Sequence, residues 1–199
     1  NGVKTLTGNL EVTIQGSNDA PVFSSLGLAS SILGYEDSEV VISLADIQNR
    51  SNAADVDGII ASYLITSVTS GTLRVGSSSE SATPWNSTSN AVVDATHRAY
   101  WVPPAESSGF LPAFEMIAMD NLGLVSSGSV GLIVNVQSVN DVPVANAQSI
   151  TPTEDTTYTG TLTGSDVEGS ALTYVVVTQG AKGTVTITNA STGAFTYVP

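Results

Sequence analysis

Apolar and polar residues alternate with a period of two in short stretches along the whole chain, as in strands that bury one face. Turn-forming residues separate these stretches at intervals of roughly 8–12 residues, a spacing typical of β-sandwiches. One helical turn is predicted at 44–50 (LADIQNR). The predicted strands are residues 10–15, 40–44, 61–68, 71–75, 98–102, 114–119, 130–136, 158–164, 172–178, 183–188 and 194–198. The pattern therefore predicts an all-β fold.

Five short landmarks occur twice, in the same order, which indicates tandem copies of one module. They are Asn-Asp-x-Pro-Val, Glu-Asp, Asp-Val-acidic-Gly, Gly-Thr-apolar and aromatic-Val-Pro. The first copy begins them at Asn18, Glu36, Asp55, Gly71 and Trp101, and the second copy at Asn140, Glu154, Asp166, Gly183 and Tyr197.

The repeat divides the chain into three parts. Residues 1–17 match the end of the complete copy, so we expect them to be the last strand of a preceding module. Residues 18–139 are a complete module, and residues 140–199 are the front part of a following one. The complete module is longer between its last two landmarks because of an insertion within 76–97, and insertions of this kind lie in exposed loops.

The charge balance limits the function. Lys and Arg number 5 against 18 Asp and Glu, for a formal net charge of −13. Such a surface repels phosphate backbones, so nucleic-acid binding is not expected, whereas it suits divalent cations. The chain has no cysteine, which excludes disulfides and thiolate sites. It also has no apolar run of membrane-spanning length, so membrane insertion is not expected.

The recurring landmarks are rich in the hard oxygen donors that calcium prefers, because calcium takes six to eight oxygen ligands. The Asp-x-Asp-Gly loop holds two carboxylates near one another, and its glycine permits a tight turn. Each motif alone is also ordinary turn chemistry. Their ordered recurrence favours metal ligation.

With Asn-Asp-x-Pro at the junctions, Asp-Val-Asp-Gly inside and "AMDNLG" near the last strands, the chain resembles cadherin-type repeats. It is most similar to the bacterial cadherin-like and VCBS-type immunoglobulin-like repeats of large calcium-dependent (RTX-type) surface adhesins. The resemblance implies tandem Greek-key immunoglobulin/cadherin-like β-sandwich modules with calcium where modules meet. The implied ligands are Asn18, Asp19, Asp55, Asp57 and Asp120 at the first junction, and Asn140, Asp141, Asp166, Glu168 and Glu36 at the second.

The resemblance also implies a function. We expect a calcium-rigidified spacer, outside the cell on a bacterial surface, that projects a binding domain and contacts neighbouring repeats of its own chain. The alternative is a module that binds surface glycans or proteins through the 76–97 insertion. In that case Trp85 could stack on a sugar, unless it folds back to cap the sandwich.

Two further expectations concern catalysis and assembly. The only histidine, His97, lies in the insertion without a nucleophile-elbow motif, so no enzyme activity is expected. Residues 1–17 could pair with an incomplete sheet of the same chain or of a second copy by strand exchange.

Overall fold

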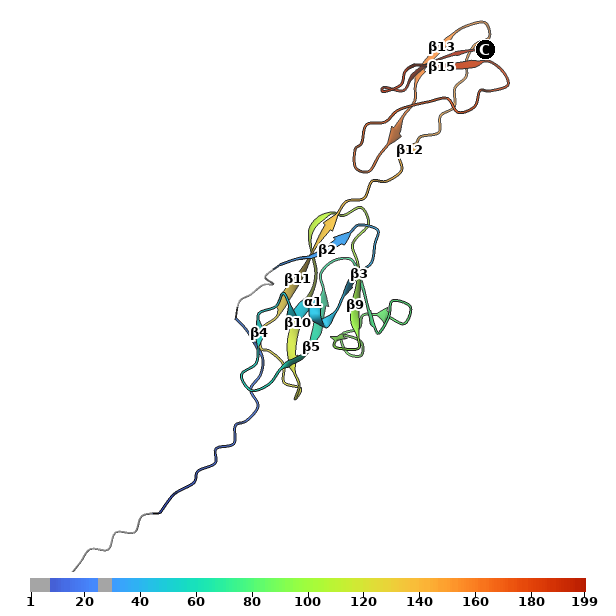
Figure 1. Cartoon of the computed structure of the whole chain (residues 1–199). Helices are drawn as coiled ribbons and strands as arrows, with labels where there is room; N and C mark the ends of the chain where they lie inside the picture. Colours follow the sequence, from blue (N-terminus) through green and yellow to red (C-terminus); the bar gives the residue numbers. More distant parts are fainter. Residues whose placement is uncertain (1–7, 25–29) are drawn as a thin grey trace, which may run out of the picture. The chain divides into compact units, whose positions relative to one another are not determined.

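The computed structural model describes residues 8–24 and 30–199 of the chain (Figure 1). The chain forms two compact units, Asn1–Ser138 and Val139–Pro199. The division falls one residue before the module boundary that the repeat predicts. No helix among the described residues is both long enough and apolar enough to cross a membrane.

The first unit contains two main sheets (Figure 1). The five-stranded sheet has the order β2 (Ile32–Tyr35), β11 (Val130–Gln137), β10 (Gly109–Asp120), β5 (Ile60–Val68) and β8 (Val92–Val93). The four-stranded sheet has the order β3 (Val40–Ile42), β9 (Arg98–Val102), β6 (Thr72–Gly76) and β7 (Thr83–Pro84). All neighbours are antiparallel except β2 and β11, which are parallel. Because β3 pairs with β9 and not with β2, the chain crosses between sheets as in a Greek key.

One core lies between these sheets. In β11, Leu132 and Val134 are buried while Ile133 is exposed, which is the alternation that the sequence predicts. The opposite sheet contributes Trp101, which is fully buried and whose Nε1 donates to Ser70 O at 2.7 Å. Buried side chains of both sheets belong to the same cluster. The predicted all-β sandwich is confirmed.

Two short elements complete the first unit. The predicted helical turn is α1 (Leu44–Gln48), which begins with a capping box. Ser43 accepts from Asp46 N, and the Asp46 carboxylate accepts from Ser43 N at 3.0 Å. β1 (Val22–Phe23) pairs with β4 (Ala53–Ala54), and this pair brings the beginning of the module beside the Asp55 loop.

The second unit repeats part of this plan. It has a pair of β12 (Val144–Ala145) with β14 (Gly164–Ser165), and a sheet of β13 (Tyr158–Thr161), β16 (Ala194–Val198) and β15 (Thr184–Asn189). The register recurs as well. Val22 pairs with Ala54 as Val144 pairs with Ser165, and Val40 pairs with Trp101 as Tyr158 pairs with Tyr197. The landmarks that match in sequence thus occupy matching sheet positions.

Two predicted strands do not form. Residues 10–15 lie in an extended stretch without strand pairing, and Leu10 and Ile14 are 88% and 87% exposed. A strand needs a hydrogen-bonded neighbour. In the described part of the chain, residues 8–17 belong to no sheet. Residues 1–7 lie outside the described part.

The second wrong strand prediction is 172–178. Its counterpart in the first unit is β5, which pairs along its length with β10. Residues 140–199 contain no segment that corresponds to β10. Without that neighbour, residues 172–178 keep alternating exposure but form no ladder.

Candidate functional site

An acidic cluster lies at the N-terminal end of the first unit, where the chain enters it. The side-chain amide Nδ2 of Asn18 donates to Asp120 Oδ2 at 2.6 Å, and Asp19 N donates to Asp57 Oδ1 at 3.2 Å. Pro21, three residues after Asn18, is fully buried and fixes the segment on the module. We call Asn18, Asp19, Asp55, Asp57 and Asp120 the N-terminal cluster. The structure brings all five predicted residues together.

The Asp55 loop presents its carboxylates through a tight turn. Asp55 Oδ1 accepts from Asp57 N at 3.1 Å and from Gly58 N at 2.6 Å. A Cβ atom at Gly58 would lie 2.8 Å from Asn121 Oδ1 and 3.1 Å from Asp55 Oδ1. A larger residue at this position of the Asp-x-Asp-Gly motif would therefore crowd these side-chain oxygens, which favours glycine.

Asp120 ends β10 and is the most buried acid of the cluster, with 3% of its surface exposed. Its Oδ1 accepts from Leu122 N at 2.8 Å and from Leu124 N at 2.9 Å. Burial raises the pKa of Asp120, but hydrogen bonds from the Asn18 side chain and the following backbone amides outweigh it. The net result is a pKa below the ordinary value, so this carboxylate is ionised at neutral pH.

Asn121 also belongs to this site, although it was not predicted from the sequence. Asn121 Oδ1 accepts from Ile59 N at 3.0 Å, and Asn121 N donates to Ile59 O at 3.1 Å. These bonds join the Asp55 loop to the end of β10. Its position directly after Asp120 in "MDNLG" was the available signal, because Asn side chains commonly bond to nearby backbone.

The N-terminal cluster offers oxygen donors of a chemistry that suits calcium, but among the described residues its carboxylates do not form a group of three with oxygens within 4.8 Å of one another. Within the described residues, Asp55 Oδ2 and Asn18 Oδ1 are buried oxygens without a hydrogen-bond partner. Buried polar atoms are normally paired, so these two oxygens are open to a further donor or to a cation. Four carboxylates and one amide oxygen are hard donors of the type that calcium prefers over softer metals.

Glu36 does not belong to this cluster. It follows β2 and is buried, and its backbone N–H donates to Gln137 O at 3.0 Å, where β11 leaves the unit. β10 begins at this end, since Gly109 pairs with Val136, and it ends at Asp120. Glu36 and Asp120 are therefore at opposite ends of the first unit, and Glu36 lies beside the exit of the chain.

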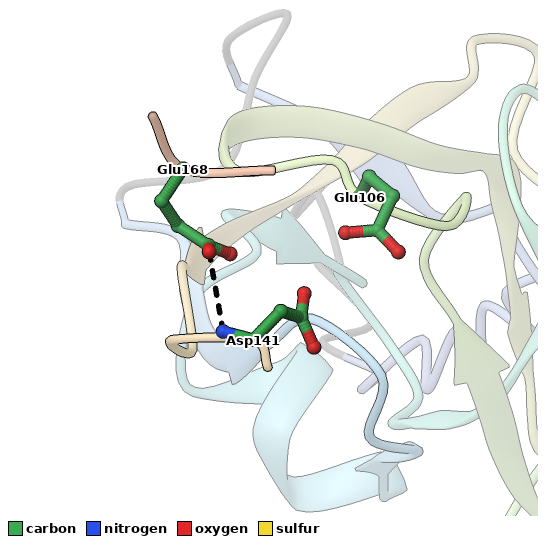
Figure 2. Close-up of side chains that lie close together, drawn as sticks. All are labelled: Glu106, Asp141 and Glu168. Carbon is green, nitrogen blue, oxygen red and sulfur yellow. Dashed lines mark hydrogen bonds between the residues drawn. The ribbon is translucent and has the colours of Figure 1, made fainter. Parts of the chain in front are cut away.

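The second unit repeats one contact of the cluster. Asp141 N donates to Glu168 Oε2 at 3.1 Å, as Asp19 N does to Asp57 (Figure 2). Glu168 therefore serves the same acceptor role as the shorter Asp57. Figure 2 also labels Glu106, which belongs to the first unit and lies on its turn between β9 and β10 with a φ of 54°.

The remaining predicted residues of the second unit lie around the same loop. Asp166 Oδ1 accepts from Ser170 N at 2.8 Å, and Asn140 Oδ1 accepts from Ser170 Oγ at 3.5 Å. A counterpart of Asp120 is missing, since residues 140–199 have no counterpart of β10. Asp155, after Glu154, has a φ of 57°, the value that Asp37 has after Glu36.

The insertion holds the two aromatic residues singled out from the sequence. Trp85 is half-buried and packs against the core, and its Nε1 donates to Ile65 O at 3.4 Å. Trp85 therefore folds back and caps the sandwich, which is the second of the two positions considered for it. His97 is half-exposed, and its Nδ1 lies 3.1 Å from Asp94 Oδ1.

Comparison with known proteins supports the bacterial immunoglobulin-like character of the repeat. Residues 140–199 match a family model described as a bacterial Ig domain. No curated protein matches the chain. Among solved structures, an endo-fucoidan hydrolase from glycoside hydrolase family 107 is similar at 19% identity and a TM-score of 0.36. The similarity covers 94% of this chain and 25% of that protein, so the chain spans a quarter of its length.

Proposed function

We propose that this chain is a calcium-binding spacer of a bacterial cell-surface adhesin, which holds a binding domain away from the cell. The observation that carries the proposal is the N-terminal cluster, where the unpartnered oxygens of Asn18 and Asp55 lie among carboxylates. The bacterial Ig match of residues 140–199 and the recurring register support a tandem repeat.

The proposed role of calcium is mechanical. Without a cation, the carboxylates of the cluster repel one another. The incoming segment is then held by the Asn18 and Asp19 hydrogen bonds, by Pro21 and by the β1–β4 pair that follows. A bound ion would neutralise this charge and join three pieces, namely the incoming segment, the Asp55 loop and the end of β10. The resemblance implies one more ligand, of the Glu36 type, from a preceding module. The segment between modules would then stiffen.

Extracellular calcium-binding modules commonly have dissociation constants of about 10⁻⁴–10⁻³ M. At the tighter end of this range, about 1 mM calcium is ten times the dissociation constant, and an ion that binds only the folded state then stabilises it by about 1.4 kcal/mol. We therefore expect millimolar calcium to raise the melting temperature by several degrees and to extend the particle in small-angle scattering.

The test is to measure both properties on the full chain in calcium and then in chelator. Asp57→Asn removes one carboxylate of the cluster, and Glu80→Gln removes an exposed charge in the insertion as a matched control. The proposal predicts that calcium stabilises the wild type and Glu80→Gln more than Asp57→Asn. If calcium changes neither melting nor shape, the proposal is wrong.

A further inference from the structure

The 76–97 insertion has a defined structure that the sandwich itself does not require. In the second unit, β15 and β16 match β6 and β9 of the first unit. A turn at 190–193 is all that joins β15 to β16. In the first unit, the guanidinium of Arg74 pairs with the Glu39 carboxylate and donates to Ser79 O at 2.8 Å. Ser79 Oγ donates to Glu39 Oε1 at 2.6 Å. The beginning of the insertion is thereby fixed to the four-stranded sheet.

The middle of the insertion is fixed as well. Asn90 Nδ2 lies within hydrogen-bonding distance of Thr83 O at 2.9 Å and Val75 O at 3.2 Å. Trp85 packs against the core and so anchors the same segment. An insertion held at three points keeps a constant surface, and a surface of this kind can be a preorganised binding site.

That surface contains a recess of about 320 Å³. Leu64 and Val92 provide apolar side chains, and Ser87, Ser89, Asp94 and His97 provide polar ones. Ser87 and Ser89 are exposed, so their hydroxyls can donate and accept. At this volume the recess lies at the small end of the roughly 300–1,000 Å³ range of small-molecule sites.

Asp94 and His97 are held in position by the loop. Asp94 Oδ1 accepts from Thr96 N and from His97 N, each at 2.7 Å, and the ring of His97 contacts Asp94 through Nδ1. Burial raises the pKa of Asp94, but these bonds and that of the Thr96 hydroxyl hold it at about 2, so the group is an anionic acceptor at neutral pH. The His97 side chain is half-exposed and lines the recess.

We propose that this recess binds a neutral sugar of one or two rings. A sugar offers hydroxyls that need both donors and acceptors, which the serines, Asp94 and His97 provide, and C–H groups that suit Leu64 and Val92. An anionic ligand is disfavoured by Asp94 and by the net charge of −13. Trp85 anchors the insertion but does not line the recess, and the recess is separate from the N-terminal cluster.

The test is a titration of the isotope-labelled full chain with methyl glycosides of glucose, galactose, mannose and fucose, followed by NMR. We expect saturable shifts of the amides of Leu64 and residues 87–97 with at least one of them. Asp94→Asn keeps the Oδ1 acceptor that orders the loop but removes the charge, and Ser89→Ala changes an exposed hydroxyl only. Each should weaken binding about tenfold, as expected for loss of a hydrogen bond in a small site.

Asp57→Asn is the matched control, since it removes the same charge outside the recess. It should lower calcium affinity and leave glycoside binding unchanged, so the two proposals can fail separately. The sugar proposal is overturned if no glycoside gives saturable shifts, if the shifts lie outside the recess, or if Asp94→Asn and Ser89→Ala both bind like wild type.

Discussion

The Asn18 side-chain amide lies 2.6 Å from Asp120, although 102 positions separate the two residues in the sequence. This bond joins the segment that leads into the first unit to the end of β10. The amide donates through Nδ2, so its Oδ1 remains as a potential cation ligand. Asn18 is thus suited to hold Asp120 and to coordinate an ion at once, which neither aspartate nor alanine can do.

Asn18→Ala should weaken both functions of this residue. Loss of its hydrogen bond to the Asp120 carboxylate should lower the melting temperature even in chelator. Loss of one oxygen ligand should also lower calcium affinity, which isothermal titration calorimetry measures. Ser17→Ala, at the exposed neighbouring position, is the control. Equal behaviour of the two variants would contradict the assigned contact.

Asp120 should make stability depend on pH. Its pKa in the folded state is below the ordinary value of about 3.9 in an unfolded chain. A depressed pKa contributes stability that is present above the unfolded value and is lost as the pH falls through the folded value. In chelator, the urea midpoint of wild type should therefore exceed that of Asp120→Asn at pH 6, and this difference should shrink below about pH 4. A difference independent of pH would show that Asp120 acts by packing alone.

Four residues of the N-terminal cluster lie in motifs that recur in order, and the resemblance to cadherin-type repeats added Asp120 to them. Asp55, Asp57 and Asp120 stand beside predicted strands, and a sandwich brings strand ends together. Asn121 was missed because a single asparagine in a turn has many local uses. The resemblance assigned Glu36 to the second junction, and the structure places Glu36 at the opposite end of the first unit from Asp120.

Strand prediction failed where alternation had no neighbour to pair with. Residues 10–15 and β11 share the same apolar spacing, yet only β11 lies between two strands. Alternation reports which face a strand would bury, whereas the ladder depends on partners distant in sequence. For the same reason, residues 172–178 form no strand although their counterpart β5 does. The recess beside Asp94 and His97 was not predictable either, because it depends on how Arg74, Asn90 and Trp85 fix the insertion.

Glu168→Gln tests whether the second unit uses its acidic loop as the first one does. Glutamine keeps an oxygen that can accept from Asp141 N, so stability in chelator should change little. The lost charge should lower calcium affinity at this loop, as Asp57→Asn does in the first unit. This affinity can be measured from the NMR shifts of the amides of residues 140–141 and 166–170 during a calcium titration. Unchanged calcium-dependent shifts in Glu168→Gln would exclude Glu168 as a ligand.

The Gly-Thr landmark makes a prediction about folding that applies to both units. Gly71 and Gly183 have φ values of 68° and 113°, in the region that favours glycine. A Cβ atom would lie 2.2 Å from Val102 O at Gly71 and 2.4 Å from Val198 O at Gly183, and backbone oxygens cannot move aside cheaply. Substitution by alanine should therefore destabilise the affected unit by at least about 2 kcal/mol through strain and overlap.

Gly128→Ala is the control, because a Cβ atom there meets nothing within 4 Å in the described part of the chain. It should change stability by no more than about 0.5 kcal/mol. Urea unfolding followed by NMR can assign each loss to its unit, since amides of residues 30–138 and 140–199 report separately. Gly71→Ala should affect only the first set and Gly183→Ala only the second. If either variant behaves like Gly128→Ala, the assignment of a shared left-handed turn before β6 and β15 is contradicted. The structural equivalence of the two Gly-Thr landmarks is then contradicted as well.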